Sequence, residues 1–468
     1  MIIAVRSGVI EASSKLWDGQ VDRSLAAITR DPPQSPISEI AQDQDPRGGK
    51  SRWRGLVQVL GPGLITGASD DDPSGIATYS QAGAQFGFQL IWTLVFSWPL
   101  MCVIQEISAR IGRVTGRGIA GVIKRHYPPS VLYGLVILLV VANTINIGAD
   151  LGAMTAALQL VMGGPTLAYL VMFAVASVLL EIFVRYSRYV GVLKWLTASL
   201  LAYVAVAFSV NVPWGQVAHA VLVPKFSLDA DYLTVVVAVL GTTISPYLFF
   251  WQAGEEVEDT IQRPGAKPLA RAPEQARSEF ARIRIDTYLG MAFSNAVAIF
   301  IVITTAATLH SHGIRDIQTS AQAAEALRPI AGRFVFLVFA LGIIGTGLLA
   351  LPVLAGSAAY AVGETLGWHV GLARKFAHAK GFYAVIAAST GVGLILNYSS
   401  LDPVKALFWS AVVNGVVAVP IMVFMMLVTS RKDTMGIFVL PPMLKLGGWL
   451  ATAVMLAAAI GMFATIGR

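Results

Sequence analysis

The chain has 468 residues, of which 55% are hydrophobic and only 13% are charged, and its mean hydropathy is +0.66. A soluble domain carries roughly 25% charged residues, so this composition excludes an ordinary soluble protein. The net charge of +7 does not indicate a nucleic-acid partner, because the basic residues gather in short segments between apolar runs. The single cysteine, Cys102, excludes internal disulfides and a cysteine-based metal site.

Residues 1–54 differ in composition from the rest of the chain. They are polar, contain several prolines and mix both signs of charge, and they lack the apolar core of a signal peptide. We expect them to form a mostly disordered cytoplasmic tail. Residues 55–468 are expected to form the membrane domain.

Apolar runs recur along the whole of the second segment. A helix needs about 20 residues to cross a hydrocarbon core of about 30 Å. The predicted fold class is therefore all-α, a polytopic membrane protein with about 11 transmembrane helices. The predicted spans are 55–79, 88–110, 131–161, 166–186, 190–211, 231–258, 284–309, 333–359, 382–397, 403–429 and 446–466.

The basic residues are distributed unequally between alternate connections. With the N-terminus placed in the cytoplasm, the cytoplasmic connections hold 20 Lys and Arg residues and the opposite side holds 6. Cytoplasmic loops are the ones enriched in basic residues. We therefore expect a multi-pass protein of a bacterial plasma membrane, with its N-terminus inside and its C-terminus outside.

Two of the predicted spans are interrupted by proline and glycine. The first contains GASDDDPSG, residues 67–75, and the sixth contains LGTTISPY, residues 240–247. A proline removes one backbone donor and frees carbonyls of the preceding turn, which lipid cannot satisfy. Interrupted segments at equivalent places in two halves indicate a 5+5 inverted repeat with the binding site where the interruptions meet.

The first interruption carries three consecutive carboxylates at bilayer depth. A carboxylate there is costly and usually functional, and Asp72 is the principal candidate ligand for a metal. Neighbouring residues point in different directions, so at most one more carboxylate joins it, and Asp71 is a second candidate. Carboxylates, hydroxyls and carbonyls suit Mg²⁺, Mn²⁺ or Ca²⁺ better than copper. The second interruption supplies Thr242 and Ser245.

The third predicted span carries a polar stripe. Asn143, Asn146 and Asp150 stand at i, i+3 and i+7 and so share one helix face. Such a face is expected to lie in the bundle interior, either joining helices or lining a polar pathway. Asn414, in the tenth span, is a further candidate for the pathway.

These motifs together resemble the NRAMP family of divalent metal transporters. The stretch GPGLITGASDDDPSGIATYSQAGAQFGFQLIW resembles the family's Asp-Pro-Gly-Asn region, and GTTISPY stands where the family carries Met-Pro-His. IQEISARIGRVTGRGIA and ADLGA resemble the family's second-span and third-span segments. The resemblance implies a LeuT-type fold, alternating access and secondary transport, often coupled to protons.

Departures from the family pattern concern the metal ligands. In the resemblance Asp72 matches the metal-binding aspartate, whereas Gly75 replaces a ligating asparagine and Ser245 replaces the methionine. Loss of the thioether removes the soft ligand that favours Mn²⁺, Fe²⁺ or Cd²⁺, and glycine enlarges the site. A roomier oxygen site suits Mg²⁺, which dehydrates reluctantly. The pattern is closest to the NRAMP-related magnesium transporters, with Gly75 and Thr242 contributing mainly shape and backbone carbonyls.

Other departures concern proton coupling. Asp150 matches an acidic residue that the family associates with proton transfer, but Ala153 replaces its glutamate companion. Tyr247 replaces the histidine, and a tyrosine does not titrate near neutral pH. We expect weak or absent proton coupling.

Three alternative functions can be weighed against metal transport. An amino-acid-type transporter on the same fold would bind a substrate carboxylate, which the acidic residues of the first span would repel. Proton-coupled uptake of Mn²⁺ or Fe²⁺ is the alternative closest to the family pattern. A membrane enzyme would need a nucleophile–base pair or metal-ligand spacing that the sequence lacks. We expect no enzyme activity and no cofactor other than the divalent ion carried as substrate.

Overall fold

The computed structural model describes residues 66–67, 69–184, 198–372, 374, 376–398 and 402–465. All of them belong to one contact unit, Leu56–Arg468. The predicted tail, the beginning of the first predicted span and part of the fifth lie outside the described residues. The described residues form helices and no strands.

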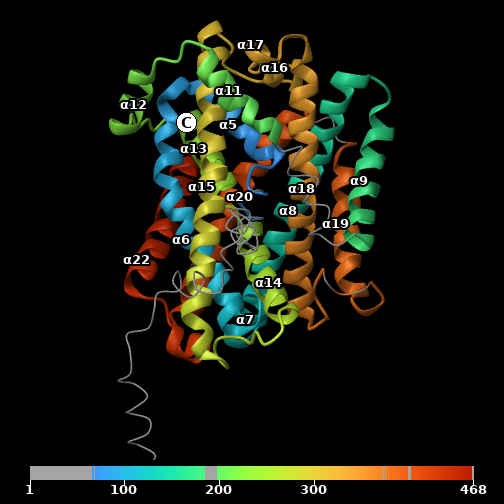
Figure 1. The fold of residues 1–468 in the computed structure, drawn as a ribbon, viewed down its shortest axis with the longest axis vertical. Coiled ribbons are helices and arrows are strands. Elements are labelled where there is room, and N and C mark those ends of the chain that lie inside the picture. Colours follow the sequence, from blue (N-terminus) through green and yellow to red (C-terminus); the bar gives the residue numbers. More distant parts are fainter. Residues whose placement is uncertain are drawn as a thin grey trace, which may run out of the picture. The chain divides into compact units, whose positions relative to one another are not determined.

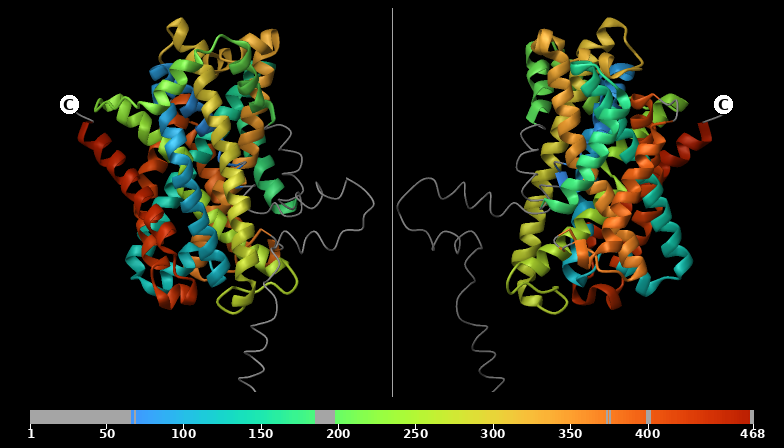
Figure 2. Two further views of the ribbon diagram at one scale, coloured as in Figure 1. Left: turned by 60° about the vertical axis from the view of Figure 1, so that its left-hand side comes forward. Right: turned by 90° about the vertical axis from the view of Figure 1, so that its right-hand side faces the viewer.

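The described helices pack together in one bundle (Figures 1 and 2). Those of the first half are α5 (Pro73–Phe86), α6 (Ile91–Thr115), α7 (Ile119–His126), α8 (Pro129–Met162), α9 (Thr166–Phe183), α11 (Leu201–Ser209) and α12 (Trp214–Leu222). Those of the second half are α13 (Ala230–Thr243), α14 (Pro246–Gln262), α15 (Ala276–Thr308), α16 (Ser320–Glu325), α17 (Arg328–Ala331), α18 (Val335–Leu366), α19 (Lys380–Leu396), α20 (Pro403–Thr429), α21 (Lys432–Met435) and α22 (Pro442–Thr465). Short 3-10 turns are Gly87–Leu90, Ala198–Leu200, Pro273–Gln275, His310–His312, Gly332–Phe334, Phe376–His378 and Gly436–Phe438.

Within the described residues, eight helical stretches are long and apolar enough to cross a membrane. The number becomes nine if Ala198–Ser209 and Trp214–Leu222, which are bent by 109° relative to each other, count as one span. The stretch Pro73–Thr115 contains both α5 and α6, and Lys380–Leu396 is apolar but shorter. The predicted number of 11 spans therefore stays a prediction, although α20 coincides with the expected tenth span.

Helix breaks occur at both predicted places. Asp72 has extended backbone, with φ −70° and ψ 170°, and α5 starts at Pro73. Helix α13 ends at Thr243, the next two residues leave the helical conformation, and α14 starts at Pro246. Proline suits the first position of a helix because its missing N–H would have no partner there. Each proline therefore starts a new helix after a non-helical segment.

The packing of the helices agrees with a repeat of five spans. Helix α5, after the first break, packs on α15, and α14, after the second break, packs on α6. Helices α5 and α6 belong to the first and second spans, and α14 and α15 to the sixth and seventh. A repeat of five spans pairs the first span with the sixth and the second with the seventh, so the two contacts are equivalent. Helix α8 packs on α18, a contact between the third and eighth spans, which the same repeat pairs with each other.

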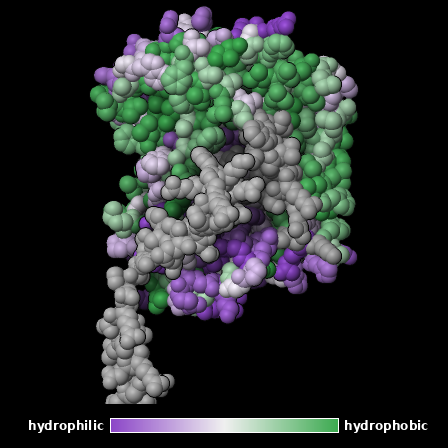
Figure 3. Space-filling view, in the orientation of Figure 1, coloured by the Kyte–Doolittle hydropathy of each residue, from purple (hydrophilic) through white to green (hydrophobic). Residues whose placement is uncertain are grey.

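The surface of the membrane domain is apolar along its sides. In Figure 3 hydrophobic side chains cover much of the sides of the visible face, whereas polar side chains gather toward its upper and lower ends. Large apolar side chains such as Ile137 on α8, Phe293 on α15 and Phe463 on α22 are at least half exposed. Such a surface is stable when lipid surrounds it.

Candidate metal-binding site

Asp72 lies at the point where the first break meets the start of α5. Its side chain is 1% exposed, and its Oδ1 accepts hydrogen bonds from the Gly75 N–H at 2.7 Å and the Ser74 hydroxyl at 2.8 Å. Aspartate is a favoured residue at this position because it satisfies one of the unpaired N–H groups of the first turn. The local fold of the break thus fixes one carboxylate oxygen and leaves the other to face the bundle.

The second oxygen of Asp72 joins the two interrupted spans to the third. Its Oδ2 accepts from Asn146 Nδ2 on α8 at 2.9 Å and from the Tyr247 hydroxyl on α14 at 3.4 Å. Asn146 and Asp72 are 74 positions apart, and Tyr247 is 175 positions from Asp72. The first and second breaks therefore meet at Asp72.

The polar cluster continues from Asn146 toward α20. Asn146 Nδ2 lies 3.4 Å from Asp150 Oδ2, and Asn414 Nδ2 donates to Asn146 Oδ1 at 3.5 Å. Asp150 Oδ1 and Asn414 Oδ1 are buried and have no hydrogen-bond partner among the described residues. Buried acceptors normally have a donor, so a cation bound at this place would be stabilised by both oxygens.

Thr242 and Ser245 lie at the second break, as the sequence predicts. The Thr242 hydroxyl donates to the Tyr79 hydroxyl of α5 at 3.0 Å. The Ser245 hydroxyl bonds to the backbone carbonyls of Gly241 and Thr242, both at 2.7 Å. Ser245 therefore satisfies carbonyls that Pro246 has freed, and the side chain after the break that contacts Asp72 is Tyr247.

Gly75 is closely surrounded by Tyr79, Asp72 and the backbone of Asp70. A Cβ atom at this position would lie 3.3 Å from Tyr79 Cε2 and 3.4 Å from Asp72 Oδ1. A longer side chain would thus grow directly next to the carboxylate. The glycine contributes its N–H to Asp72, and its lack of a side chain lets Tyr79 and Asp72 lie close to it.

The three polar residues that the sequence places on one face of α8 have two different sets of partners. Asn143 Nδ2 donates to the Leu354 carbonyl at 2.9 Å and to the Ser357 hydroxyl at 2.8 Å, both on α18. These contacts join α8 to α18. Asn146 and Asp150 face the Asp72 cluster instead.

Asp70 and Asp71 turn toward α15. The Ser294 hydroxyl lies 2.7 Å from Asp70 Oδ2 and 3.1 Å from Asp71 Oδ1. Asp71 thus has a different partner from Asp72. Sequence reasoning missed Ser294 and Tyr79; a polar Ser-Asn pair inside the seventh span was the available indication for Ser294.

The carboxylates of the centre are buried without basic partners. Asp70, Asp71, Asp72 and Asp150 are each at most 4% exposed. Among the described residues, no Lys, Arg or His lies within ion-pairing distance of any of them. The same residues contain no group of three or more His, Cys, Asp or Glu that could hold a metal ion. A cation at Asp72 would therefore be held by few charges, neutral oxygens and water.

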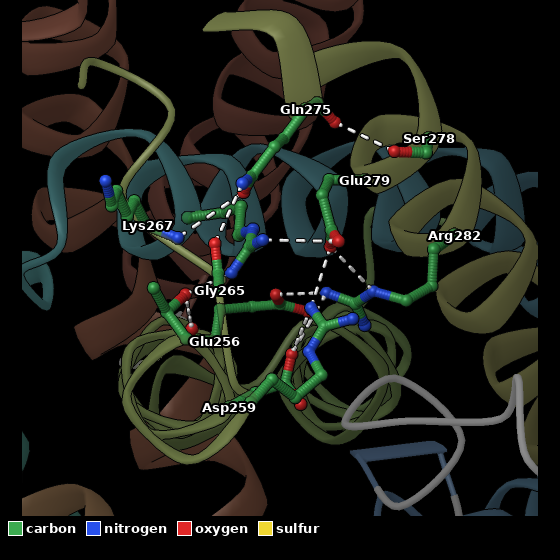
Figure 4. A network of polar contacts seen from close by, with 11 residues as sticks. Glu256, Asp259, Gly265, Lys267, Gln275, Ser278, Glu279 and Arg282 are labelled. Atoms are coloured by element: carbon green, nitrogen blue, oxygen red, sulfur yellow. Dashed lines mark hydrogen bonds and ion pairs between the residues drawn. The ribbon is translucent and has the colours of Figure 1, made fainter. Parts of the chain in front are cut away.

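Ion pairs close the end of the bundle that the positive-inside rule assigns to the cytoplasm. Figure 4 shows Arg282 of α15 among acidic side chains of α14 and α15. Arg282 lies 2.5 Å from Glu256, which is fully buried, and 3.0 Å from Glu279. Arg113 of α6 lies 3.2 Å from Glu279 and donates to the Thr260 hydroxyl. These contacts join α6, α14 and α15.

A cavity of about 490 Å³ borders the C-terminal half of α5. Its walls include Gln81 of α5, Asp231 and Thr234 of α13, Asp316 and Lys405. Asp231 stands near the start of α13 and Thr242 near its end, so the cavity lies toward the helix ends remote from the second break. The described residues therefore show a cavity at this end of the bundle and an ion-pair network at the other.

Residues 63–465 match the family model described as natural resistance-associated macrophage protein-like, Nramp. The chain belongs to the Nramp family. The match covers most of the chain, so the resemblance to this family that the sequence motifs indicate is confirmed. Nramp membership makes the chain a multi-pass membrane transporter rather than an enzyme.

Curated relatives of this Nramp chain include two bacterial proteins named divalent metal cation transporter MntH. That of Klebsiella pneumoniae (strain 342) is 26% identical over 410 residues, covering 86% of this chain and 92% of the relative. That of Bacillus subtilis (strain 168) is 26% identical over 436 residues, covering 91% and 96%.

Solved structures share the fold of this Nramp chain. The Eremococcus coleocola manganese transporter, crystallised with an aromatic bis-isothiourea substituted compound, superposes with a TM-score of 0.69 at 17% identity, covering 91% of this chain and 90% of the other. Mhp1, a nucleobase-cation-symport-1 family transporter in a closed conformation, gives 0.54 at 14% identity, covering 87% and 92%. Together with the two breaks, these likenesses confirm the predicted all-α, LeuT-type architecture.

Proposed function

We propose that this Nramp protein moves divalent metal cations, Mg²⁺ and/or Mn²⁺, across the membrane by alternating access, with weak or absent proton coupling. The observation that carries the proposal is the contact between the two breaks: Asp72 from the first meets Tyr247 from the second at 3.4 Å. Around this contact, buried carboxylates have no basic partner among the described residues. The names of the MntH relatives support a divalent metal as the substrate class.

The side chains close to Asp72 offer oxygen atoms, and neither sulfur nor imidazole nitrogen, as possible metal ligands. Asn146 donates its Nδ2 to Asp72 and Asp150, and Asp150 Oδ1 and Asn414 Oδ1 lack a donor among the described residues. Oxygen ligands suit Mg²⁺ and Mn²⁺, and Mg²⁺ usually keeps several waters when a protein binds it.

Backbone carbonyls at the second break also favour a positively charged substrate. Helix α13 ends at Thr243, and the carbonyls of Gly241 and Thr242 already point to the Ser245 hydroxyl. The C-terminal end of a helix is negative, and such ends coordinate cations in transporters with interrupted helices. In our proposal Thr242 and Ser245 act through these carbonyls and hydroxyls, Asp72 supplies the charge, and Asp71 acts at a distance.

The proposed weakness of proton coupling follows from the groups near Asp72. Asp150 has no acidic companion one turn away, because Ala153 stands on that side. Tyr247 stands where the family pattern carries a histidine, a residue that titrates near neutral pH. Asn146 bridges Asp72 and Asp150, and its amide group does not titrate. We therefore propose Asp150 as the proton carrier next to Asp72, without the acidic companion that the family pattern carries.

Two alternatives predict different measurements. Proton-coupled uptake of Mn²⁺ or Fe²⁺ requires acidification of the vesicle lumen together with metal entry. An amino-acid-type transporter is disfavoured by Asp72, since its carboxylate would repel a substrate carboxylate at the break.

Transport into proteoliposomes tests the proposal. The purified chain is reconstituted, and entry of Mg²⁺, Mn²⁺, Fe²⁺ and Cd²⁺ is followed with trapped metal indicators beside a trapped pH indicator. We expect entry of Mg²⁺ and Mn²⁺ without a matching fall of lumenal pH, and loss of both in Asp72→Asn. Strong Fe²⁺ or Cd²⁺ entry with Mg²⁺ ignored contradicts the proposed selectivity, and acidification in proportion to metal entry contradicts the proposed coupling.

A further inference from the structure

Asp70 and Asp71 share one hydroxyl group. The Ser294 oxygen lies 2.7 Å from Asp70 Oδ2 and 3.1 Å from Asp71 Oδ1. A hydroxyl has one hydrogen to donate, so it cannot satisfy both carboxylates at once. Asp70 Oδ1 has no partner among the residues that the structure describes. At least two carboxylate oxygens therefore lack a donor at this place.

The burial of the pair makes these unpaired oxygens significant. Asp70 is 1% exposed and Asp71 is 4% exposed, and no described basic residue forms an ion pair with either. Unpaired buried carboxylates are strongly unfavourable. Within a membrane domain such groups usually mark an ion pathway.

Close backbone packing holds the pair against α15. A Cβ atom added to Gly67 would lie 2.3 Å from the Gly290 carbonyl carbon, so only glycine allows this approach. Asp71 follows Gly67 by four residues, and Ser294 follows Gly290 by four. The glycine contact therefore brings the two carboxylates and the hydroxyl together as a consequence of the fold.

The hydrogen bonds of this pair differ from those of Asp72. The oxygens of Asp72 bond to Gly75, Ser74, Asn146 and Tyr247, whereas Asp70 and Asp71 share the Ser294 hydroxyl on α15. The pair is thus held by a different helix from those that bring Asn146 and Tyr247 to Asp72.

We propose that Asp70, Asp71 and Ser294 form a second subsite for a divalent cation, between the first break and α15. The inference rests on the proposed function and adds a second ion to it. The ligands are carboxylate and hydroxyl oxygens, which favour Mg²⁺, and water completes the coordination because Mg²⁺ is usually held by one or two carboxylates plus waters. The proposed subsite would hold a second cation in addition to the one proposed at Asp72.

Mg²⁺ binding stoichiometry tests the inference. The full-length chain in detergent or nanodiscs is titrated calorimetrically with MgCl₂ at constant ionic strength. We expect two Mg²⁺ per wild-type chain, one for the double variant Asp70→Asn/Asp71→Asn, and one for Asp72→Asn. Asp402→Asn, at the start of α20, removes the same charge elsewhere and should leave two. Ser294→Ala should weaken the second Mg²⁺ at least tenfold without altering the first.

The outcomes separate this inference from the proposed function. One Mg²⁺ in the wild type that persists in Asp70→Asn/Asp71→Asn and disappears in Asp72→Asn overturns the second subsite alone. No Mg²⁺ or Mn²⁺ binding by folded wild type overturns the proposed function as well. Elution as a single species and an unchanged helical circular dichroism spectrum establish folding, and if the double variant fails them, Ser294→Ala and Asp70→Asn carry the test.

Discussion

The Tyr247 hydroxyl donates a hydrogen bond to Asp72 Oδ2 at 3.4 Å and so connects two breaks that are 175 positions apart. Both residues are at most 1% exposed. Alternating access in an inverted repeat requires the two halves to share one site near the middle of the bundle. This hydrogen bond is a direct link between the breaks, and it holds the carboxylate that we propose as the metal ligand.

Tyr247→Phe keeps the ring and removes the hydroxyl. One net hydrogen bond contributes about 1 kcal/mol, so we expect the Kd for Mg²⁺ to rise about fivefold, because Asp72 loses one of the groups that orient it. Calorimetric titration measures the change. Tyr383→Phe is the matched control, since its hydroxyl bonds to the Leu372 and Arg374 carbonyls elsewhere. Equal affinities in the two variants would assign Tyr247 a packing role only.

Asp72→Asn removes the charge at the break but keeps a residue that caps a helix. Asparagine is as good an N-cap as aspartate, so we expect the thermal unfolding temperature to stay within the range of the wild type. Metal affinity at this site should fall more than 100-fold. Asp402→Asn changes the corresponding residue at the start of α20, where Oδ1 accepts from the Val404 N–H at 2.9 Å, and should leave affinity unchanged. Retention of this site's affinity by Asp72→Asn would refute its role as the ligand.

Ser245→Met introduces the thioether that the family pattern carries at this position. A soft ligand favours Cd²⁺ over Mg²⁺, so we expect the ratio of Kd for Mg²⁺ to Kd for Cd²⁺ to increase at least tenfold. Competition between the two metals in a binding assay gives the ratio directly. Ser97→Met on α6, another buried serine bonded to its own helix, controls for bulk. The idea fails if both variants change the ratio alike.

Arg282→Gln tests the closure at the ion-paired end. The substitution leaves Glu256, which is fully buried, without its partner at 2.5 Å. Removing one member of a buried pair costs about 3–5 kcal/mol, so the unfolding free energy in detergent should fall by that order. Glu256→Gln in addition should recover part of the loss.

The control for this closure is an exposed ion pair. Arg328 bonds to Glu325 at the surface, where an ion pair contributes little. Arg328→Gln should therefore leave the unfolding transition unchanged. Equal effects of Arg282→Gln and Arg328→Gln would show that the ion-paired end contributes nothing specific.

Much of the centre follows from sequence because proline and glycine act locally. Pro73 and Pro246 each follow a run of polar residues and glycine, and each starts a new helix, which places Asp72 and Ser245 at breaks. Proline alone does not decide this, since Pro99, Pro352 and Pro420 lie inside continuous helices. The family pattern then relates the two breaks to each other. These are the parts that the structure reproduces.

The remaining contacts depend on which helix lies beside each residue. Asn143 and Asn146 are three residues apart, about 60° around a helix, which at a junction of several helices is enough to give them different partners. Asp71 turns to Ser294 because Gly67 packs on Gly290, a long-range contact that no local rule predicts. The number of spans is likewise not settled by the described residues, since parts of the first and fifth lie outside them.

The most direct test is to locate the ion. Crystals of the chain grown with Mn²⁺ and measured at the manganese absorption edge reveal bound manganese by its anomalous scattering. We predict a peak within coordination distance of an Asp72 carboxylate oxygen, between α5 and α14. A peak confined to other parts of the chain, with the surroundings of Asp72 empty at saturating Mn²⁺, would contradict the account.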